Sequence, residues 1–241
     1  MTCALELRHV SKVYGSGPSE VNALSDVELS VERGELVAVM GPSGSGKSTL
    51  LTIAGSLEDA SSGQVLVDGI DLAAVSRSDR ARLRRRSIGY VFQDFNLLPG
   101  LTALENVTLP LELDGIPLKR AREAGLEALE ELDVVDQADR FPDELSGGQR
   151  QRIAIARAVV GERGLLLADE PTGALDSVNG EAVMRLLRAA TQRGVAGVVV
   201  THEAQLASWA DRVVFLRDGH VVDQTVAPPG PESLLATADR R

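Results

Sequence analysis

Residues 36–48 read LVAVMGPSGSGKS and contain the main evidence for the fold. Leu36–Met40 is an apolar run of strand length, the next eight residues fit the pattern Gly-x4-Gly-Lys-Ser, and Lys47–Gly55 is compatible with a helix. Glycines let backbone N–H groups converge on phosphate oxygens where a Cβ would intrude, and the helix N-terminus attracts the same anion. A buried strand, a glycine turn and a helix in this order predict a phosphate-binding loop.

The residue types of this loop suggest what each part does. Lys47 supplies a point charge for the outer phosphates of a nucleotide, and the Ser48 hydroxyl is placed to ligate Mg²⁺. The alternative is a glycine-rich turn that binds nothing, which the complete pattern disfavours. The residues that we expect to contact the nucleotide are Gly41, Pro42, Ser43, Gly44, Ser45, Gly46, Lys47, Ser48 and Thr49.

Composition and charge limit the possible partners. The chain has 241 residues, 44% hydrophobic and 25% charged, as expected of a globular protein with a substantial core. A net charge of −10 disfavours binding to nucleic acid, and 3% aromatic residues provide few platforms for stacked bases. Cys3 is the single cysteine, so no intrachain disulfide forms. Because no signal peptide and no run of roughly 18 apolar residues is visible, we expect a soluble chain without a membrane span.

Apolar runs of strand length alternate with helical patterns, which indicates a mainly parallel sheet covered on both faces. Further strands are expected at Ala4–Val10, Val27–Val31, Gln64–Val67, Ile88–Phe92, Leu165–Ala168, Gly197–Thr201 and Arg212–Leu216. A helix-prone, arginine-rich segment precedes Ile88, and another helix is expected at Glu181–Gln192. Asp218 and Gly219 predict a hairpin turn before a last strand at Val221–Asp223.

Residues 97–160 differ from the rest of the chain in their secondary-structure pattern. Strand signals nearly vanish there, and helical patterns dominate Leu118–Leu132 and Gly147–Val160. Prolines are expected to delimit the elements of this region, namely Pro99, Pro110, Pro117 and Pro142. We predict one domain over residues 1–241, with a core at about 1–96 and 161–225, an inserted helical subdomain at about 97–160 and a loosely ordered tail at about 226–241.

The apolar run Leu165–Ala168 ends in two carboxylates, Asp169 and Glu170. At the edge of a sheet Asp169 would be held where it can bind the magnesium shell. Glu170 would face the terminal phosphate and accept a proton from the attacking water. A strand that ends in an acidic turn is common, so the pair alone leaves both interpretations open. The phosphate loop favours the catalytic one.

A third motif, Leu145–Gln149, reads LSGGQ and begins a predicted helix. Exposed N–H groups without side-chain obstruction make a helix N-terminus an anion site. The alternative is that Ser146 is only an N-cap followed by flexible glycines, which would be favoured for an isolated Ser-Gly-Gly. The presence of the other two motifs makes this alternative improbable. The nucleotide contacts expected here are Ser146, Gly147, Gly148 and Gln149.

The order of these three motifs resembles the ATP-binding cassette (ABC) family, and the resemblance extends from Leu5 to about Val222. It implies an α/β fold: a P-loop NTPase core with a mainly parallel sheet, an antiparallel N-terminal β portion and an inserted α-helical subdomain. ATP and Mg²⁺ are the implied cofactors, with hydrolysis to ADP and phosphate. In this family the LSGGQ segment closes on ATP held by a second copy, so the resemblance also implies a head-to-tail homodimer.

Single residues match further positions of the family. Tyr14 matches the aromatic residue that stacks on adenine, and Gln93 matches a glutamine that senses the γ-phosphate and the membrane partner. His202 matches a switch histidine at the γ-phosphate, and Asp176 matches a loop that crosses the dimer interface. The implied catalytic residues are Lys47, Gln93, Glu170 and His202. The implied metal ligands are Ser48, Gln93 and Asp169.

Residues 91–99 (VFQDFNLLP) and 105–111 (ENVTLPL) look most like one branch of the family. Its members serve lipoprotein-releasing, macrolide-exporting, antimicrobial-peptide-resistance and cell-division permeases. The resemblance implies an ATPase subunit that drives a separate integral membrane permease, by export or force transmission, from the cytoplasmic face of the membrane. The alternative is a soluble ABC ATPase of DNA repair or translation. Those usually carry a coiled coil, a zinc module or a second cassette, which this sequence lacks.

Two surface features leave alternatives open. One is an arginine cluster, Arg82, Arg84, Arg85 and Arg86. We favour a solvated helix face for this cluster over a contact with anionic lipids or a permease. The other comprises Phe95, Leu97 and Leu98, which we expect to line a groove for a short cytoplasmic helix of the permease. Burial in the chain's own core is the competing explanation for these three residues.

Overall fold

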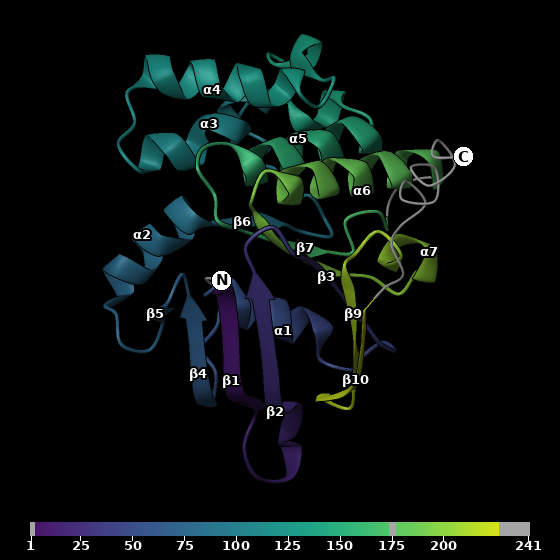
Figure 1. Cartoon of the computed structure of the whole chain (residues 1–241). Helices are drawn as coiled ribbons and strands as arrows, with labels where there is room; N and C mark the ends of the chain where they lie inside the picture. Colours follow the sequence, from purple (N-terminus) through teal and green to yellow (C-terminus); the bar gives the residue numbers. More distant parts are fainter. Residues whose placement is uncertain (1–2, 174–176, 227–241) are drawn as a thin grey trace, which may run out of the picture.

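A computed structural model describes residues 3–173 and 177–226, which form two sheets with helices packed against them (Figure 1). The strands are β1 (Cys3–Tyr14), β2 (Val21–Glu32), β3 (Leu36–Met40), β4 (Ser62–Val67), β5 (Ile70–Asp71), β6 (Ile88–Val91), β7 (Leu165–Asp169), β8 (Ala196–Val200), β9 (Arg212–Arg217) and β10 (His220–Val226). The α-helices are α1 (Lys47–Ala54), α2 (Arg77–Ser87), α3 (Ala103–Leu113), α4 (Leu118–Glu130), α5 (Gly147–Val159), α6 (Ser177–Gln192) and α7 (Ala204–Ala207). Short 3₁₀ helices cover Gly17–Ser19, Val135–Gln137 and Pro142–Glu144.

The larger sheet has the strand order β10-β9-β3-β8-β7-β6 among the described residues. Its neighbouring strands are parallel except for β9 and β10, which form the hairpin predicted around Asp218 and Gly219. In β3, Leu36 and Ala38 belong to one core cluster, whereas Val37 and Val39 belong to the other. A strand buried on both faces reads as a continuous apolar run, which is why the sequence revealed it. The predicted α/β fold with a mainly parallel sheet is confirmed.

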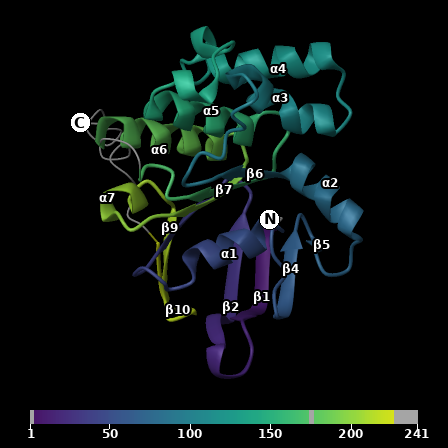
Figure 2. The ribbon, with the colours of Figure 1, turned by 180° about the vertical axis from the view of Figure 1, so that it is seen from behind.

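Each face of this sheet has its own hydrophobic core. On one face, side chains from the helices pack against the sheet, including Val107 of α3, Ile153 of α5 and Leu187 of α6. On the other face, α1 and the smaller sheet contribute, for example through Leu50 and Leu5. Figures 1 and 2 show this layering from opposite sides, with α3 to α6 above the sheet and α1, β1, β2 and β4 below it.

The smaller sheet has the order β2-β1-β4-β5, and its paired strands are antiparallel. This confirms the antiparallel N-terminal β portion. Strands β1 and β2 are both longer than the apolar runs that predicted them. Their polar ends continue to pair with each other as far as Tyr14 and Val21, because a cross-strand ladder does not require apolar side chains. The additional length matters because it carries Tyr14 towards the phosphate loop.

Helices α3, α4 and α5 lie between β6 and β7 in the chain, and two of them, α4 and α5, were predicted closely. Helix α3 was missed because Pro110 was expected to end an element, and that expectation is wrong. The helix begins with a capping box, in which Glu105 N donates to Thr102 Oγ1 and Thr102 N donates to Glu105 Oε2. Pro110 lies inside it, three residues before its end. Loss of a single helical hydrogen bond is tolerated there because α3 packs against both α4 and α5.

Gly125 of α4 is expected to tolerate no larger side chain. A Cβ at this position would lie 2.6 Å from Thr108 Cγ2 and 2.8 Å from Leu104 Cδ1, both on α3. Overpacking of this kind typically costs about 1–3 kcal/mol, which exceeds the roughly 1 kcal/mol by which alanine favours a helix over glycine. Gly125→Ala should therefore lower the free energy of unfolding, measured by urea denaturation. Gly100→Ala is the matched control, because no atom lies within 4 Å of its Cβ position. Equal stability of the two variants would contradict the close packing of α3 and α4.

Candidate nucleotide site

A cavity of about 680 Å³ lies at the carboxyl ends of β3, β7 and β8. The loops that follow parallel strands meet at this edge of a sheet, which is where ligands bind in open α/β folds. The lining residues are Val21, Asn22, Ala23, Gly41, Pro42, Ser43, Gly44, Gly46, Lys47, Ser48, Thr49, Gln93, Asp169, Glu170, Gly173, Val200 and His202. The cavity thus brings together the phosphate loop, the acidic pair, Gln93 and His202, which are up to 161 positions apart in the chain (202 − 41).

The phosphate loop is shaped by glycine. Gly46 has φ of 102°, and a Cβ there would lie 2.3 Å from the carbonyl oxygen of Ala23. A Cβ on Gly41 would lie 2.1 Å from the carbonyl oxygen of Leu216, so neither position accepts a side chain. Lys47 Nζ donates to the carbonyl oxygens of Gly41 and Pro42, each at 2.9 Å, which holds the ammonium group over the loop. Ser45 is the one member of the predicted loop that does not line the cavity; its side chain is buried.

The two carboxylates at the end of β7 are available to a cation. Asp169 Oδ1 and Glu170 Oε2 are buried and have no hydrogen-bond partner. Burial raises the pKa of Asp169, a hydrogen bond from Ser48 opposes this, and the neighbouring charge of Glu170 raises the pKa further. Carboxylate and hydroxyl oxygens are the ligands that Mg²⁺ prefers, so Asp169 and Ser48 fit a magnesium ion.

Glu170 also contacts His202. The His202 Nδ1 atom lies 2.9 Å from Glu170 Oε1. The hydrogen bond to Glu170 and the negative charge of that carboxylate raise the pKa of His202, because both favour the imidazolium form. Both residues were predicted to lie at the γ-phosphate, but their contact with each other was not predicted. No sequence signal indicates this contact, since the two residues follow different strands.

The pH dependence of this contact gives a prediction for the nucleotide-free protein. Because the pKa of His202 is raised, the ion pair is fully formed below the ordinary histidine pKa and is lost as the pH rises through the raised value. Glu170→Gln should shift the His202 pKa down towards its ordinary value in an NMR titration of the imidazole. His9 is the internal control, because its pKa is raised by Asp26 and Glu28 and should not move. An unchanged His202 titration would show that the contact does not form in solution.

Gln93 follows β6 and lines the cavity from the loop that leads into the helical subdomain. Arg157 of α5 holds this loop by donating to the carbonyl oxygens of Phe95 at 2.7 Å and Asn96 at 2.5 Å. Phe95 and Asn96 both have positive φ, so the loop has an uncommon backbone conformation at this point. Gln93 is therefore connected through a short, anchored loop to the helical subdomain.

Tyr14 does not line the cavity but lies next to its wall. It pairs across the small sheet with Val21, which is a lining residue. Three further lining residues at the start of β2 were not predicted from the sequence, namely Val21, Asn22 and Ala23. No motif marks these residues, because strand pairing alone brings them to the phosphate loop.

The LSGGQ segment lies outside the cavity. Ser146 is the N-cap of α5, where its Oγ accepts from Gln149 N and its own N donates to Gln149 Oε1. The N-cap interpretation of Ser146 is therefore correct for the single chain, and the residue is exposed. None of Ser146, Gly147, Gly148 and Gln149 lines the cavity formed by this chain. Asp176 lies outside the described residues.

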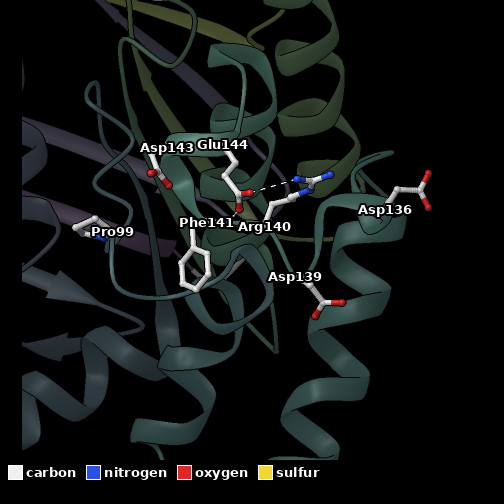
Figure 3. Close-up of a pocket in the computed structure, with 7 residues that line it drawn as sticks. All are labelled: Pro99, Asp136, Asp139, Arg140, Phe141, Asp143 and Glu144. Atoms are coloured by element: carbon white, nitrogen blue, oxygen red, sulfur yellow. Dashed lines mark hydrogen bonds and ion pairs between the residues drawn. The ribbon is translucent and has the colours of Figure 1, made fainter.

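A second hollow, of about 800 Å³, lies directly before the LSGGQ segment (Figure 3). Its lining residues are Pro99, Asp136, Asp139, Arg140, Phe141, Asp143 and Glu144. Arg140 turns towards Glu144, with 3.2 Å between Nη1 and Oε1. The hollow contains none of the predicted site residues, and its character is acidic.

The arginine cluster divides into two pairs. Arg82 and Arg86 are exposed, as a solvated face predicts. Arg84 and Arg85 are half-buried and line a groove of about 220 Å³ between α2, β6 and α3, where Arg84 Nη1 donates to the carbonyl oxygen of Ser56. The favoured interpretation is therefore wrong for this second pair.

A phosphate loop after β3 at the carboxyl edge of a parallel sheet, with an acidic pair at the end of β7 and only β8 between these strands, defines a P-loop nucleotide hydrolase. The family model described as ABC transporter matches residues 24–173. The chain belongs to this family, and the resemblance seen in the sequence is confirmed.

Individual relatives agree with this assignment. The chain is 45% identical to the uncharacterized ABC transporter ATP-binding protein YknY of Bacillus subtilis, over 90% of this chain and 95% of that protein. It is 42% identical to the macrolide export ATP-binding/permease protein MacB of Aggregatibacter actinomycetemcomitans, over 92% of this chain but only 34% of MacB. Among solved structures, the dimeric post-hydrolysis state of the ATP-binding cassette MJ0796 bound to ADP and Pi superposes with a TM-score of 0.87. The two are 41% identical, over 93% of this chain and 99% of that one.

None of the helices in residues 3–173 and 177–226 combines the length and apolar character that crossing a membrane requires.

Proposed function

We propose that this chain is the ATP-hydrolysing subunit of an ABC transporter that works as a head-to-tail dimer on a separate membrane permease. The observation that carries the proposal is that the predicted nucleotide-binding motifs lie in two separate places on the chain. One cavity gathers the phosphate loop, the acidic pair, Gln93 and His202, while the LSGGQ segment lies outside it. Each chain therefore offers one nearly complete nucleotide site and one separate anion-binding helix end.

Within one chain, the cavity residues divide the work of hydrolysis. The backbone N–H groups of the phosphate loop and the Lys47 ammonium bind the phosphates. Glu170 accepts a proton from the attacking water, because its buried Oε2 has no other partner. His202, held by Glu170 and exposed on its other side, contacts the terminal phosphate together with Gln93. Tyr14 stacks on the base from the end of β1.

Magnesium is the proposed metal, with Ser48, Gln93 and Asp169 as the residues that would hold it. When bound, it neutralises charge on the outer phosphate oxygens. The pKa of Asp169 is raised mainly because burial removes water from this carboxylate, and positive charges of the protein do not fully compensate for that loss.

The dimer follows from the location of Ser146 and Gly148. They begin α5, whose N-terminus offers unobstructed N–H groups, yet they do not line the cavity of their own chain. A nucleotide in the partner subunit would complete this anion site. The dimeric form reported for the structurally similar cassette MJ0796 supports this arrangement.

We expect ATP with Mg²⁺ to convert a Glu170→Gln variant from monomer to dimer in analytical ultracentrifugation. The variant is used because bound ATP must persist through the run. Adding Ser146→Arg should abolish the dimer but leave ATP binding to each monomer intact, because the large cation would block the partner's phosphate without touching the chain's own cavity. A strict monomer at saturating ATP, in a variant that demonstrably binds it, would refute the head-to-tail dimer.

The permease is proposed to dock in the 220 Å³ groove between α2, β6 and α3. Leu57 and Leu113 are exposed large apolar residues that line it. Of the three residues expected to face the permease, Leu98 is exposed, Leu97 packs against the chain's own core, and Arg150 lies over the ring of Phe95. None of these three residues lines the groove, so the proposed docking site differs from the predicted one and is shifted towards α2.

Export or force transmission is the proposed type of work, since the relatives include a macrolide export protein in which ATP-binding and permease parts share a chain. Attachment through the permease would place this subunit at the cytoplasmic face of the membrane. A soluble role in DNA repair or translation is not favoured, because a net charge of −10 opposes binding to nucleic acid.

A further inference from the structure

Tyr14 is held by charged groups that lie outside the nucleotide cavity. Its hydroxyl donates to the Glu58 carboxylate. The Lys12 ammonium lies 4.8 Å from the centre of the Tyr14 ring and 3.4 Å from Glu58 Oε1. The ring is thus tied at its hydroxyl end and approached by a cation, two contacts that restrict its orientation.

Glu58 is itself fixed, because its segment is bound on both sides. The Leu57 and Glu58 N–H groups both donate to the carbonyl oxygen of Thr52, at 2.8 and 3.2 Å, which ties the segment to α1. On the far side, the Asp59 carboxylate pairs with Arg80 of α2, and the Asp59 carbonyl oxygen accepts from Lys12 Nζ at 2.8 Å. Helix α1 begins at Lys47, so the segment that holds Tyr14 is built onto the same helix as the phosphate loop.

The ring lies at the rim of the cavity. Tyr14 pairs with Val21, a lining residue. About a third of Tyr14 remains exposed, at 36%. Burial, followed by the hydrogen bond to Glu58, raises the pKa of the Tyr14 hydroxyl, so this group stays protonated and remains a donor.

We propose that Glu58 is a positioning residue for the base of the nucleotide: by accepting from Tyr14, it sets the plane of the ring on which the base stacks. The inference rests on the proposed function, in which Tyr14 is the base contact. A ring fixed before binding loses less rotamer entropy when the base arrives, so the tie to Glu58 strengthens binding of the base and not of the phosphates. The competing explanation is that Glu58 only forms a surface ion pair with Lys12.

The experiment compares the binding of ADP and of inorganic pyrophosphate, measured by isothermal titration calorimetry. Pyrophosphate reports on the phosphate loop alone, because it has no base. Glu58→Ala should weaken ADP binding by about 3- to 10-fold, the scale of the net contribution of one ordinary hydrogen bond, and leave pyrophosphate binding unchanged. Tyr14→Phe should have the same effect, because it removes the donor but keeps the ring. Glu58→Gln should bind ADP nearly as the original protein does, since its amide oxygen still accepts.

The double variant Tyr14→Phe/Glu58→Ala decides between the two explanations. If Glu58 acts through the hydroxyl, the double variant binds ADP no more weakly than either single variant. Additive losses, or an equal loss for pyrophosphate, would overturn the proposal, because Glu58 would then act through Lys12 or through the phosphate loop.

The variant Tyr14→Ala tests whether Tyr14 contacts the base at all, separately from the proposed role of Glu58. Unchanged ADP binding in Tyr14→Ala would remove Tyr14 from the proposed nucleotide site altogether. Weakened binding in Tyr14→Ala, with Tyr14→Phe and Glu58→Ala both unaffected, would keep the base contact and overturn only the role of Glu58.

Discussion

Glu170→Gln should lower the rate of ATP hydrolysis by roughly 10²- to 10⁴-fold while the protein still binds ATP, as is typical when a general base is removed. The amide of glutamine has nearly the shape of the carboxylate but cannot accept the proton of the attacking water. Binding should persist because the phosphate loop and Lys47 are untouched. The measurements are single-turnover phosphate release and retention of ATP on the protein.

The control for Glu170→Gln is Glu203→Gln. Glu203 is an exposed carboxylate next to His202 that does not line the cavity, so its loss should leave turnover essentially unchanged. Hydrolysis by Glu170→Gln at the original rate would show that another group acts as the base. An equal loss of hydrolysis rate in both variants would show that hydrolysis depends on the total negative charge near His202 and not on one specific proton acceptor.

Lys47→Ala should weaken ATP binding by about 100-fold, because it removes a cation that faces several phosphate charges. A single charge pair 4 Å apart near a protein surface interacts by roughly 4 kcal/mol before solvent screening reduces it. The Lys47 ammonium is also oriented over the loop by the carbonyl oxygens of Gly41 and Pro42, so the site is arranged before the nucleotide arrives. Equilibrium titration with ATP and Mg²⁺ measures the effect.

Lys119→Ala is the matched control for Lys47→Ala, since it removes an exposed lysine of α4 far from the phosphate loop. Unchanged thermal unfolding in both variants would confirm that the fold is retained. ATP binding by Lys47→Ala at the original affinity would contradict the assignment of the phosphate loop. Together with Glu170→Gln, this variant separates binding from chemistry: one variant loses the nucleotide, and the other keeps it without hydrolysing it.

The bounds of an element were predicted best from the sequence where one local residue pattern extends over the whole element. The strand at Leu36–Met40 was predicted with its observed bounds because a strand buried on both faces is apolar at every position. The prediction failed at α3, where the general rule that proline ends a helix is outweighed by a capping box and by packing on two other helices. The ends of β1 and β2 were also missed because contacts between elements outweigh local preference. Their polar residues are ordered by pairing with each other.

The sequence by itself determined which motifs this protein carries and which chemistry they predict: the phosphate loop, the acidic pair and the LSGGQ segment are short motifs whose residue types indicate nucleotide binding and hydrolysis. Only the tertiary structure decided which of them act together. It places Gln93 and His202 in the cavity with the phosphate loop, brings His202 to 2.9 Å from Glu170, and leaves Ser146 outside. It also joins Tyr14 to Glu58, 44 residues away. The physical reason is that residue type is a local property, whereas contact between distant residues depends on strand order and packing, which the whole chain sets jointly.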